Sequence, residues 1–430
     1  MPSVTGPQDT DASLCASTPR IKLDLPIRLY DDRSLDLAKD GSSVHSGNSF
    51  NNELAALEED GLKRRLAALP AVGGKLSIDG KQVLNFSSND YLDLANDPRL
   101  KEAAMAAVDA YGCGATASRL MAGDLVLHEQ LETRLAKLVR HEASLVFASG
   151  FQANLGAITT LAGEDGVIFS DELNHASIVD GCRLAKAQVL VYRHRDMEHL
   201  EELLRSCQDA GRRVVVSDAV FSMDGDLAPV TSLRGLADRH GAYLLIDEAH
   251  GLGVFGRGAG LCAERGVRPD VIVANMTKAL GSGGGFVAAS RDFIDLLLNT
   301  ARSFIFSTGL APACAGSALR AVEIVEAEPG LGQELLRRSR SFRDVLQGKG
   351  FDIPDHPSQI IPLVIGSNQA AVAISDALLE QGVLITAVRP PSVPEGTARL
   401  RLSTTLAHAE NDLRRAADVI ASIALEAGVL

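Results

Sequence analysis

Short apolar runs alternate with amphipathic stretches along most of the chain, from Asn85 to about Glu326. The runs SLVFAS, GVIFS, QVLVY, RVVVS, AYLLID and DVIVAN are short and continuously apolar, which is typical of buried strands. Leucines at helical spacing lie between them, for example from Leu127 to Leu138. Strands that alternate with helices indicate an α/β fold with a mostly parallel sheet covered on both faces. Ligands of such sheets bind at the carboxyl ends of the strands.

The two ends of the chain depart from this alternation. Residues 1–52 lack periodic apolar positions and end in GSSVHSGNSFNN, which is typical of a flexible linker. Leucines from Leu54 to Leu69 then predict an amphipathic helix, and IIPLVI and RLRLS are the best strands near the C-terminus. We therefore expect an extension over 1–52, a helix and short strands over 53–92, a large α/β domain over 93–326 and a small α+β domain over 327–430.

Composition excludes several classes of protein. Hydrophobic residues make up 46% and charged residues 23%, and 430 residues are too many for one ordinary core, so we expect at least two globular domains. A net charge of −13 without a basic stripe argues against nucleic acid as a partner. No apolar run approaches the roughly 18 residues of a membrane helix. Asp9 and Asp11 argue against a transit peptide, and the six cysteines form no CxxC pair, so a cytoplasmic protein without bound metal is expected.

Two ionisable residues follow successive predicted strands. Asp247 ends the run AYLLID, with His250 three residues on, and Lys278 comes just after DVIVAN. The separation of 31 residues (278 − 247) is that of one strand-helix-strand unit, which places a carboxylate and an amine side by side at the ligand-binding edge. Pyridoxal phosphate (PLP) requires this pair, because its aldehyde binds a lysine and its ring nitrogen stays protonated beside a carboxylate. Either residue alone has a commoner explanation, but together they indicate PLP.

A cofactor phosphate also needs backbone donors. In SLVFASGFQANLG a predicted strand ends at Ala148, and Ser149, Gly150 and Phe151 open a helix. Free N–H groups at a helix start bind phosphate, and glycine permits a close approach. An ordinary glycine turn is the alternative. The stretch KALGSGGGFVA after Lys278 is also rich in glycine and gives a weaker signal of the same kind.

Three further polar residues occupy suitable places. His175 follows a predicted strand, where its ring would stack on a flat cofactor, cap a helix or lie in the core. Ser222 in VFSMDGD, like His250, would donate to the phenolate oxygen of PLP, although a turn role for Ser222 is equally consistent. Arg401 lies in the alternating run RLRLS and therefore faces one side, where its guanidinium group suits a carboxylate.

These motifs resemble the α-oxoamine synthase family of fold-type-I PLP enzymes. The resemblance runs from about Leu62 to the C-terminus and is carried by NFSSNDYLDLA, SGFQAN, NHASIVDG, VFSMDGD, LLIDEAHGLGVFG and the region of Lys278. It implies an aspartate-aminotransferase-like fold, with a large sheet domain and a smaller C-terminal α+β domain. The stretch RPPSVPEGTARLRLS is similar to the branch that condenses L-alanine with a pimeloyl thioester, on CoA or an acyl-carrier protein, in biotin biosynthesis.

The resemblance implies roles for individual residues. Lys278 would be the Schiff-base lysine and the acid/base, Asp247 the partner of the ring nitrogen and His175 the stacking residue. The implied contacts of the phenolate oxygen and the phosphate are Ser222, His250, Gly150 and Phe151. The implied neighbours of the amino-acid carboxylate and the acyl chain are Asn89, Arg401 and Ser392.

The sequence departs from the family in three places. Asn275 stands where a threonine usually binds the phosphate, so we expect a weaker or rearranged contact, and Ser392 stands where threonine is frequent. An arginine of the N-terminal helix contacts substrate in relatives, and here Lys63 and Arg64 compete for that role. The segment FIFSTG (304–309) resembles one that reaches the phosphate of a neighbouring subunit, which implies a homodimer.

Other functions stay open at this point. Another α-oxoamine synthase would use glycine with acetyl-CoA or serine with a long acyl thioester, and a transaminase would use the same fold. A non-catalytic scaffold subunit is a further alternative, against which Lys278, Asp247 and His175 argue, since a scaffold has no need of them. The length of the acyl chain and its thioester handle are not visible in the sequence.

Overall fold

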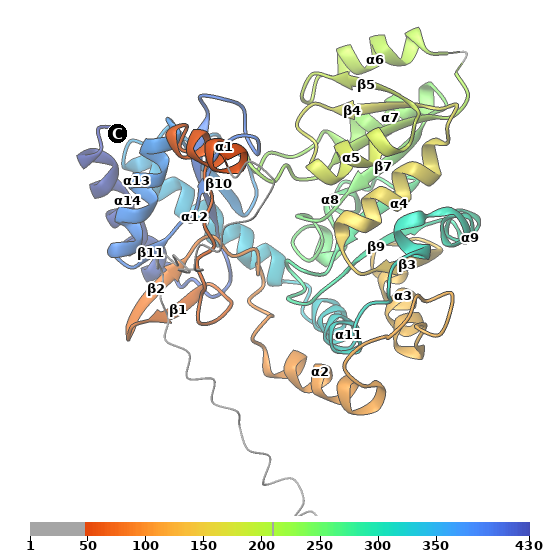
Figure 1. Ribbon diagram of the computed structural model, residues 1–430, viewed down its shortest axis with the longest axis horizontal. Helices are drawn as coiled ribbons and strands as arrows, with labels where there is room; N and C mark the ends of the chain where they lie inside the picture. The colour runs from red at the N-terminus through yellow and green to blue at the C-terminus, as the bar shows by residue number, and fades with distance from the viewer. Residues whose placement is uncertain (1–47, 209) are drawn as a thin grey trace, which may run out of the picture.

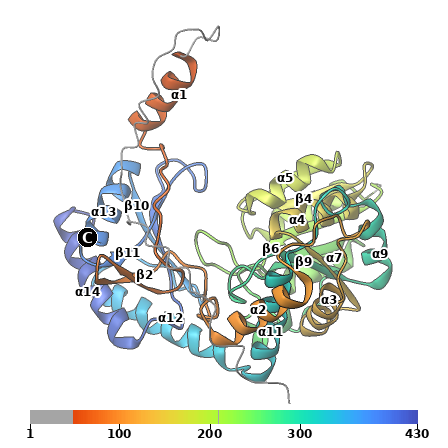
Figure 2. The same cartoon turned by 60° about the horizontal axis from the view of Figure 1, so that its bottom comes forward.

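The computed structural model describes residues 48–208 and 210–430. The predicted extension up to residue 47 lies outside this part of the chain. Figure 1 shows two units: one contains a large sheet and its helices, and the other contains two small sheets with the last three helices. Figure 2 shows the first helix projecting from the smaller unit.

The large sheet has seven strands in the order β3-β9-β8-β7-β6-β4-β5. They are β3 Ala143–Phe147, β4 Val167–Asp171, β5 Gln188–Tyr192, β6 Arg213–Asp218, β7 Tyr243–Asp247, β8 Val271–Asn275 and β9 Gly285–Ala289. Only β9 runs antiparallel to its neighbours. The six predicted strands and the mostly parallel sheet are confirmed. The sequence did not predict β9 because its short apolar run follows directly on a glycine-rich stretch.

Helices cover both faces of this sheet, as predicted. One face packs against α4 Gly150–Ala162, α5 Ala176–Leu184 and α9 Arg291–Thr300. The other face packs against α2 Pro98–Tyr111, α3 Val126–Leu138, α6 Met197–Ser206, α7 Val230–Arg239 and α11 Pro312–Ala327. The short helices η1 Gly256–Gly258, α8 Leu261–Glu264 and α10 Arg302–Ile305 lie in the connections. The two buried clusters therefore hold the strand ends in fixed positions.

The smaller unit joins segments from both ends of the chain. One sheet has the order β10-β13-β12, with β10 Ile360–Gly366, β12 Ala387–Val388 and β13 Ala398–Ser403, and confirms the two predicted C-terminal strands. The other has the order β1-β2-β11, with β1 Lys75–Ile78, β2 Lys81–Asn85 and β11 Val383–Leu384. The helices α12 Leu331–Gly348, α13 Asn368–Glu380 and α14 Glu410–Glu426 complete it. Because β2 pairs with β11, the N-terminal segment is part of this unit.

The helix predicted up to Leu69 is wrong in its second half. Helix α1 spans Asn48–Glu59, so it also includes the last residues of the predicted linker. Gly61 has φ +65°, and the backbone N–H of Leu62 donates to the carbonyl of Leu57 at 2.7 Å. This is the usual end of a helix at a left-handed glycine. The leucine spacing continues beyond Gly61, although a glycine at this place in the sequence is itself a signal that ends a helix.

Across 48–208 and 210–430, no helix is both long enough and apolar enough to cross a bilayer. Among the same residues, no group of three or more His, Cys, Asp or Glu side chains is arranged so that it could hold a metal ion.

Candidate active site

Four polar residues end neighbouring strands of the large sheet at its carboxyl edge. They are Asp171 on β4, Asp218 on β6, Asp247 on β7 and Asn275 on β8. Asp218 and Asp247 are direct partners in the strand register. Lys278 follows three residues after β8. The predicted meeting of a carboxylate and an amine at this edge is therefore present.

The Asp247 carboxylate is buried and fixed on both oxygens. Oδ2 accepts a hydrogen bond from Asn154 Nδ2 at 2.7 Å, and Oδ1 accepts one from the backbone N–H of Ala249 at 2.8 Å. Asn154 lies on α4, four residues after Gly150, and was not singled out from the sequence. The available signal was this spacing, since residues four apart share one helical face. Asn154 Oδ1 is buried without a partner in the described chain and is free to accept.

Lys278 lies beside a neutral histidine. Its Nζ is 2.8 Å from His250 Nε2, and His250 Nδ1 is 2.6 Å from the hydroxyl of Tyr91. Burial lowers the pKa of Lys278 to about 8, with Arg401 adding to the decrease and Asp247 opposing it. Burial and the neighbouring ammonium group hold the pKa of His250 well below its usual range. A lysine with this pKa supplies neutral amine near neutral pH, as a nucleophile or general base requires.

His175 takes one of its three predicted roles, that of a helix cap. Its ring nitrogen Nδ1 accepts from the backbone N–H of Ser177 at 3.2 Å, so it caps α5. Burial lowers the pKa of the ring, Asp247 opposes this decrease and Lys278 reinforces it, so the ring lies close to both charged groups. The backbone N–H of His175 donates to Asp218 Oδ2 at 2.7 Å. Burial and the neighbouring Asp247 raise the pKa of Asp218 well above its usual range.

The start of α4 lies against Asn275 at the place where the sequence predicts a phosphate cradle. Ser149 caps the helix, and a Cβ atom at Gly150 would lie only 3.0 Å from the Cβ of Asn275. The hydroxyl of Thr277 donates to Asn275 Oδ1 at 3.1 Å, which leaves the Asn275 amide group as a donor. Thr277 therefore lies two residues after Asn275, the position at which the resemblance implies a threonine. The free N–H groups at the start of α4 and the amide group of Asn275 are donors that fit a phosphate, so these residues fit PLP.

Arg401 faces the site from the smaller unit. On β13, Leu400 and Leu402 belong to the core of that unit, which leaves Arg401 on the opposite face. Its guanidinium group donates to the carbonyl of Ser222, to Asn89 Oδ1 at 3.0 Å, to Ser403 Oγ at 2.8 Å and to the Tyr91 hydroxyl at 3.3 Å. A guanidinium group has five N–H donors, so one on Nη2 is left for a ligand. To bind a carboxylate with two hydrogen bonds, the guanidinium group of Arg401 would have to release one of these four acceptors.

Ser222 and Ser392 line one cavity of about 300 Å³, although they come from different units. Arg399 lines the same cavity and pairs with Asp224. The cavity therefore brings the residue predicted near the phenolate oxygen and the residue predicted near the acyl chain to one place.

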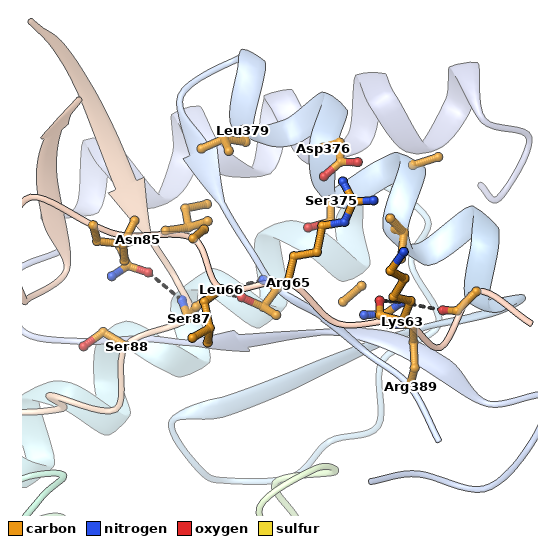
Figure 3. A pocket seen from close by; sticks show the side chains of 18 of the residues that line it. Lys63, Arg65, Leu66, Asn85, Ser87, Ser88, Ser375, Asp376, Leu379 and Arg389 are labelled. Atoms are coloured by element: carbon orange, nitrogen blue, oxygen red, sulfur yellow. Dashed lines mark hydrogen bonds between the residues drawn. The ribbon is translucent and has the colours of Figure 1, made fainter. Parts of the chain in front are cut away.

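Lys63 and Arg64 lie beyond the end of α1 and point to different places. Lys63 lines a second cavity, of about 1070 Å³, together with Arg389, as Figure 3 shows. Its Nζ pairs with Glu58 at 2.7 Å. Arg64 instead donates to the carbonyl of Pro390 at 2.9 Å and does not line this cavity. Ser88 lines it and immediately precedes Asn89, so the cavity borders the Arg401 side of the site.

Comparisons with known proteins show the family of this chain. The family model described as aminotransferase class I and II matches residues 81–420. An 8-amino-7-oxononanoate synthase of Geobacter sulfurreducens is 45% identical over 89% of this chain and 99% of its own length. One from Anaeromyxobacter dehalogenans is 47% identical over 83% of this chain and 90% of its own length.

Solved structures resemble the backbone closely. Serine palmitoyltransferase of Sphingomonas wittichii has a TM-score of 0.84 and 30% identity, covering 90% of this chain and 100% of its own. An 8-amino-7-oxononanoate synthase of Francisella tularensis has a TM-score of 0.69 and 25% identity, covering 80% of this chain and 98% of its own. A further serine palmitoyltransferase structure that contains PLP has a TM-score of 0.84 and 28% identity, covering 89% of this chain and 98% of its own.

Proposed function

We propose a reaction on the premise that this chain belongs to the aminotransferase class I and II family and, within it, to the 8-amino-7-oxononanoate synthases. The reaction is the PLP-dependent condensation of L-alanine with a pimeloyl thioester, which releases the thiol and carbon dioxide and gives 8-amino-7-oxononanoate for biotin synthesis. One observation carries it: the chain shares 45% identity with an enzyme of that name along 99% of the relative's length.

When bound, PLP supplies an electron sink beside the amino-acid Cα. Lys278 would hold the cofactor until the amino group of L-alanine displaces its Nζ, and the freed amine would then take the Cα proton and return a proton to Cα after carbon dioxide has left. A pKa of about 8 suits both directions of this transfer near neutral pH. Asp247, held by Asn154 and Ala249, keeps the proton on the ring nitrogen. His250 accepts from the ammonium form of Lys278 and so orients it.

Arg401 and Asn89 bind the carboxylate of L-alanine in this proposal. Arg401 has one unengaged N–H on Nη2, and Asn89 is held by Arg401 and Tyr91 through its Oδ1, which leaves its amide group as a donor. Fixing the carboxylate sets the Cα–H bond in the orientation that Lys278 requires.

Serine palmitoyltransferase activity is the second candidate, because the solved structures of that enzyme have higher TM-scores. Enzymes with either activity share this backbone, so the TM-score does not distinguish them. Substrate choice depends on side chains, for which sequence identity is the better guide. We expect a thiol-release assay to give the highest kcat/KM for L-alanine with a pimeloyl thioester. L-serine with palmitoyl-CoA, or glycine with acetyl-CoA, giving a higher value would replace the proposal.

Lys63 contacts the acyl thioester in this proposal, since it lines the larger cavity and Arg64 does not. The change Lys63→Gln should raise the KM of the acyl thioester roughly two- to fivefold, because partly exposed charges contribute little. The KM of L-alanine should stay unchanged. Steady-state kinetics with each substrate varied in turn measures both values.

The matched control is Arg64→Gln, which removes a neighbouring charge that points elsewhere. If Arg64→Gln raises the acyl-thioester KM and Lys63→Gln does not, then Arg64 is the substrate contact.

The homodimer is also part of the proposal. Exposed apolar side chains gather near the phosphate cradle: Phe151, Leu120, Met121 and Phe306. They lie together because Ser118 bridges to Thr308 and Gln152 on α4 donates to Ser307 at 3.1 Å. A contiguous apolar patch of this kind marks an interaction surface. A second copy of the chain covers it in a two-fold dimer.

Light scattering should give twice the mass of the chain for the wild type. Phe306 is 71% exposed, so Phe306→Glu should not disturb the core, yet it should place a charge in the interface and yield monomer. Leu425→Glu, at a side chain 60% exposed on α14, is the control and should stay dimeric. An active wild-type monomer would rule the dimer out.

The proposal retains the cytoplasmic location and the lack of a nucleic-acid partner. It also retains the large domain over 93–326 and the small domain over 327–430, to which the segment containing β2 is added, while α1 begins at Asn48 and not after residue 52. The apolar patch near residues 304–309 lies within the proposed large domain. The cysteines in the described part of the chain are free thiols, which is the state expected in a reducing compartment such as the cytoplasm.

A further inference from the structure

His194 lies at the same sheet edge as Asp247, after β5, and the proposed reaction gives it no role. Its Nδ1 is 2.8 Å from Asp171 Oδ1, and its Nε2 is 2.7 Å from Asp226 Oδ2. The His194 side chain is 21% exposed, and the two carboxylates are 1% and 4% exposed. The ring also stands edge-on to Phe221, with centroids 4.4 Å apart. We call Asp171, His194 and Asp226 the His194 clamp.

The first carboxylate of the clamp shapes the turn that carries His175. Asp171 Oδ1 accepts from the backbone N–H of Leu173 at 2.9 Å, and its Oδ2 accepts from the backbone N–H of Arg195 at 3.0 Å. The backbone carbonyl of Asp171 accepts from the N–H of Asn174 at 3.2 Å. His175 is the next residue, so a displacement of Asp171 moves the ring that lies close to Asp247 and Lys278.

The second carboxylate closes the loop that carries Ser222. The carbonyl of Asp226 accepts from the backbone N–H of Phe221 at 3.0 Å, so residues 221–226 form a closed loop. Within it, the carbonyl of Ser222 accepts from Arg401. The His194 clamp therefore connects the turn 171–175 with the loop 221–226. In the sequence, β5 and β6 separate the turn from the loop, so the clamp is a contact between segments that are distant along the chain.

The clamp requires a charged ring. Both partners are carboxylates, and only an imidazolium ring donates from both nitrogens. Burial lowers the pKa of His194, but the hydrogen bonds to Asp171 and Asp226 outweigh it and raise the pKa to about 9. Two cationic or titratable groups face Asp226: Arg195, whose Nη1 lies 3.2 Å away, and His356. Two carboxylates also lie close to the clamp: Glu172, which accepts from the backbone N–H of His194 at 2.8 Å, and Asp218 beside Asp171.

We propose that His194 is a positioning residue for the cofactor: as an imidazolium ion it ties the His175 turn to the Ser222 loop and so sets the spacing of the two side chains that flank the PLP ring. This inference rests on the proposed use of PLP but not on the identity of the acyl thioester.

The test measures cofactor binding. The change His194→Gln keeps one donor group, replaces the other with an acceptor oxygen and removes the positive charge. The dissociation constant of PLP should rise about tenfold to a hundredfold, as expected for a lost charged hydrogen bond. The visible circular dichroism of the bound cofactor should also change, because His175 and Ser222 move relative to the ring. The control is His199→Gln, whose ring accepts from Arg193 and contacts neither turn.

Chemical rescue separates positioning from stability. His194 lines the cavity of about 300 Å³, so imidazole can enter the space left by His194→Gly. Added imidazole should restore PLP affinity and the circular dichroism signal. If both variants only lower Tm, and PLP affinity and circular dichroism stay at the wild-type values, the proposal is overturned. If His194→Gly fails to fold, His194→Gln alone decides between these outcomes.

The pH dependence gives an independent check. The folded pKa of about 9 lies above the ordinary value of 6.5, so the clamp stabilises the fold fully below pH 6.5 and loses this contribution as the pH rises through 9. The Tm of the wild type should exceed that of His194→Gln at pH 6 and approach it at pH 10. A difference in Tm that does not change with pH would show that the charge is not involved. A failed thiol-release assay would leave all these measurements intact, so the two proposals fail separately.

Discussion

Replacing Lys278 with alanine is expected to abolish turnover and the covalent attachment of the cofactor. Lys278 is the amine at the sheet edge next to Asp247, and it both holds PLP and moves the Cα proton in the proposed reaction. Loss of a covalent attachment and a general base together should lower kcat at least about 10³-fold. The wild type should be yellow and give an adduct that borohydride fixes to Lys278, and the variant should give neither that adduct nor product.

Lys101→Ala is the matched control, because Lys101 is exposed on α2 and far along the chain from the strand edge. It should keep colour and turnover. A wild-type protein that is colourless and stays inert with added PLP would contradict the assignment of Lys278.

Replacing Arg401 with lysine is expected to raise the KM of L-alanine roughly tenfold to a hundredfold, since a charged hydrogen bond to the carboxylate is lost. Lysine keeps the charge but loses the planar set of donors. The KM of the acyl thioester and the absorbance of the bound cofactor should change little. Steady-state kinetics and a visible spectrum measure these quantities.

Arg399→Lys is the control for this experiment, because Arg399 lies two residues away on the same strand and pairs with Asp224. It should leave the KM of L-alanine nearly unchanged. If Arg401→Lys raises both KM values or removes the colour, then Arg401 acts mainly through its four protein acceptors and holds the two units together. Arg389, which lines the larger cavity, would then be the next candidate for the carboxylate.

The sequence predicted those parts of the fold that depend on local patterns of apolar and polar residues. The buried strands are short continuous apolar runs, and the site lies where those runs end, so Asp247 and Lys278 were placed by counting along the chain. The parallel sheet follows from the same alternation. The alternating run around Arg401 likewise placed its side chain on the face opposite the small core.

The parts that were missed depend on partners far away in the sequence. Asn154 acts through Asp247, Tyr91 through His250 and Arg401, and His194 through two carboxylates on other segments. No local pattern shows such pairings, and the same holds for the pairing of β2 with β11. The length of α1 was predicted wrongly for a different reason. Gly61 is a helix-ending residue that is visible in the sequence, but the leucine spacing by itself predicted a longer helix.

The central claim is that this site joins an amino acid to an acyl group with loss of the amino-acid carboxyl group. The most direct measurement incubates the protein and PLP with L-alanine labelled with ¹³C at C1 and a pimeloyl thioester, and follows both products by mass spectrometry. The account predicts labelled carbon dioxide, one thiol for each carbon dioxide released, and unlabelled 8-amino-7-oxononanoate. Labelled pyruvate without carbon dioxide or thiol would show a transaminase instead and would contradict the account.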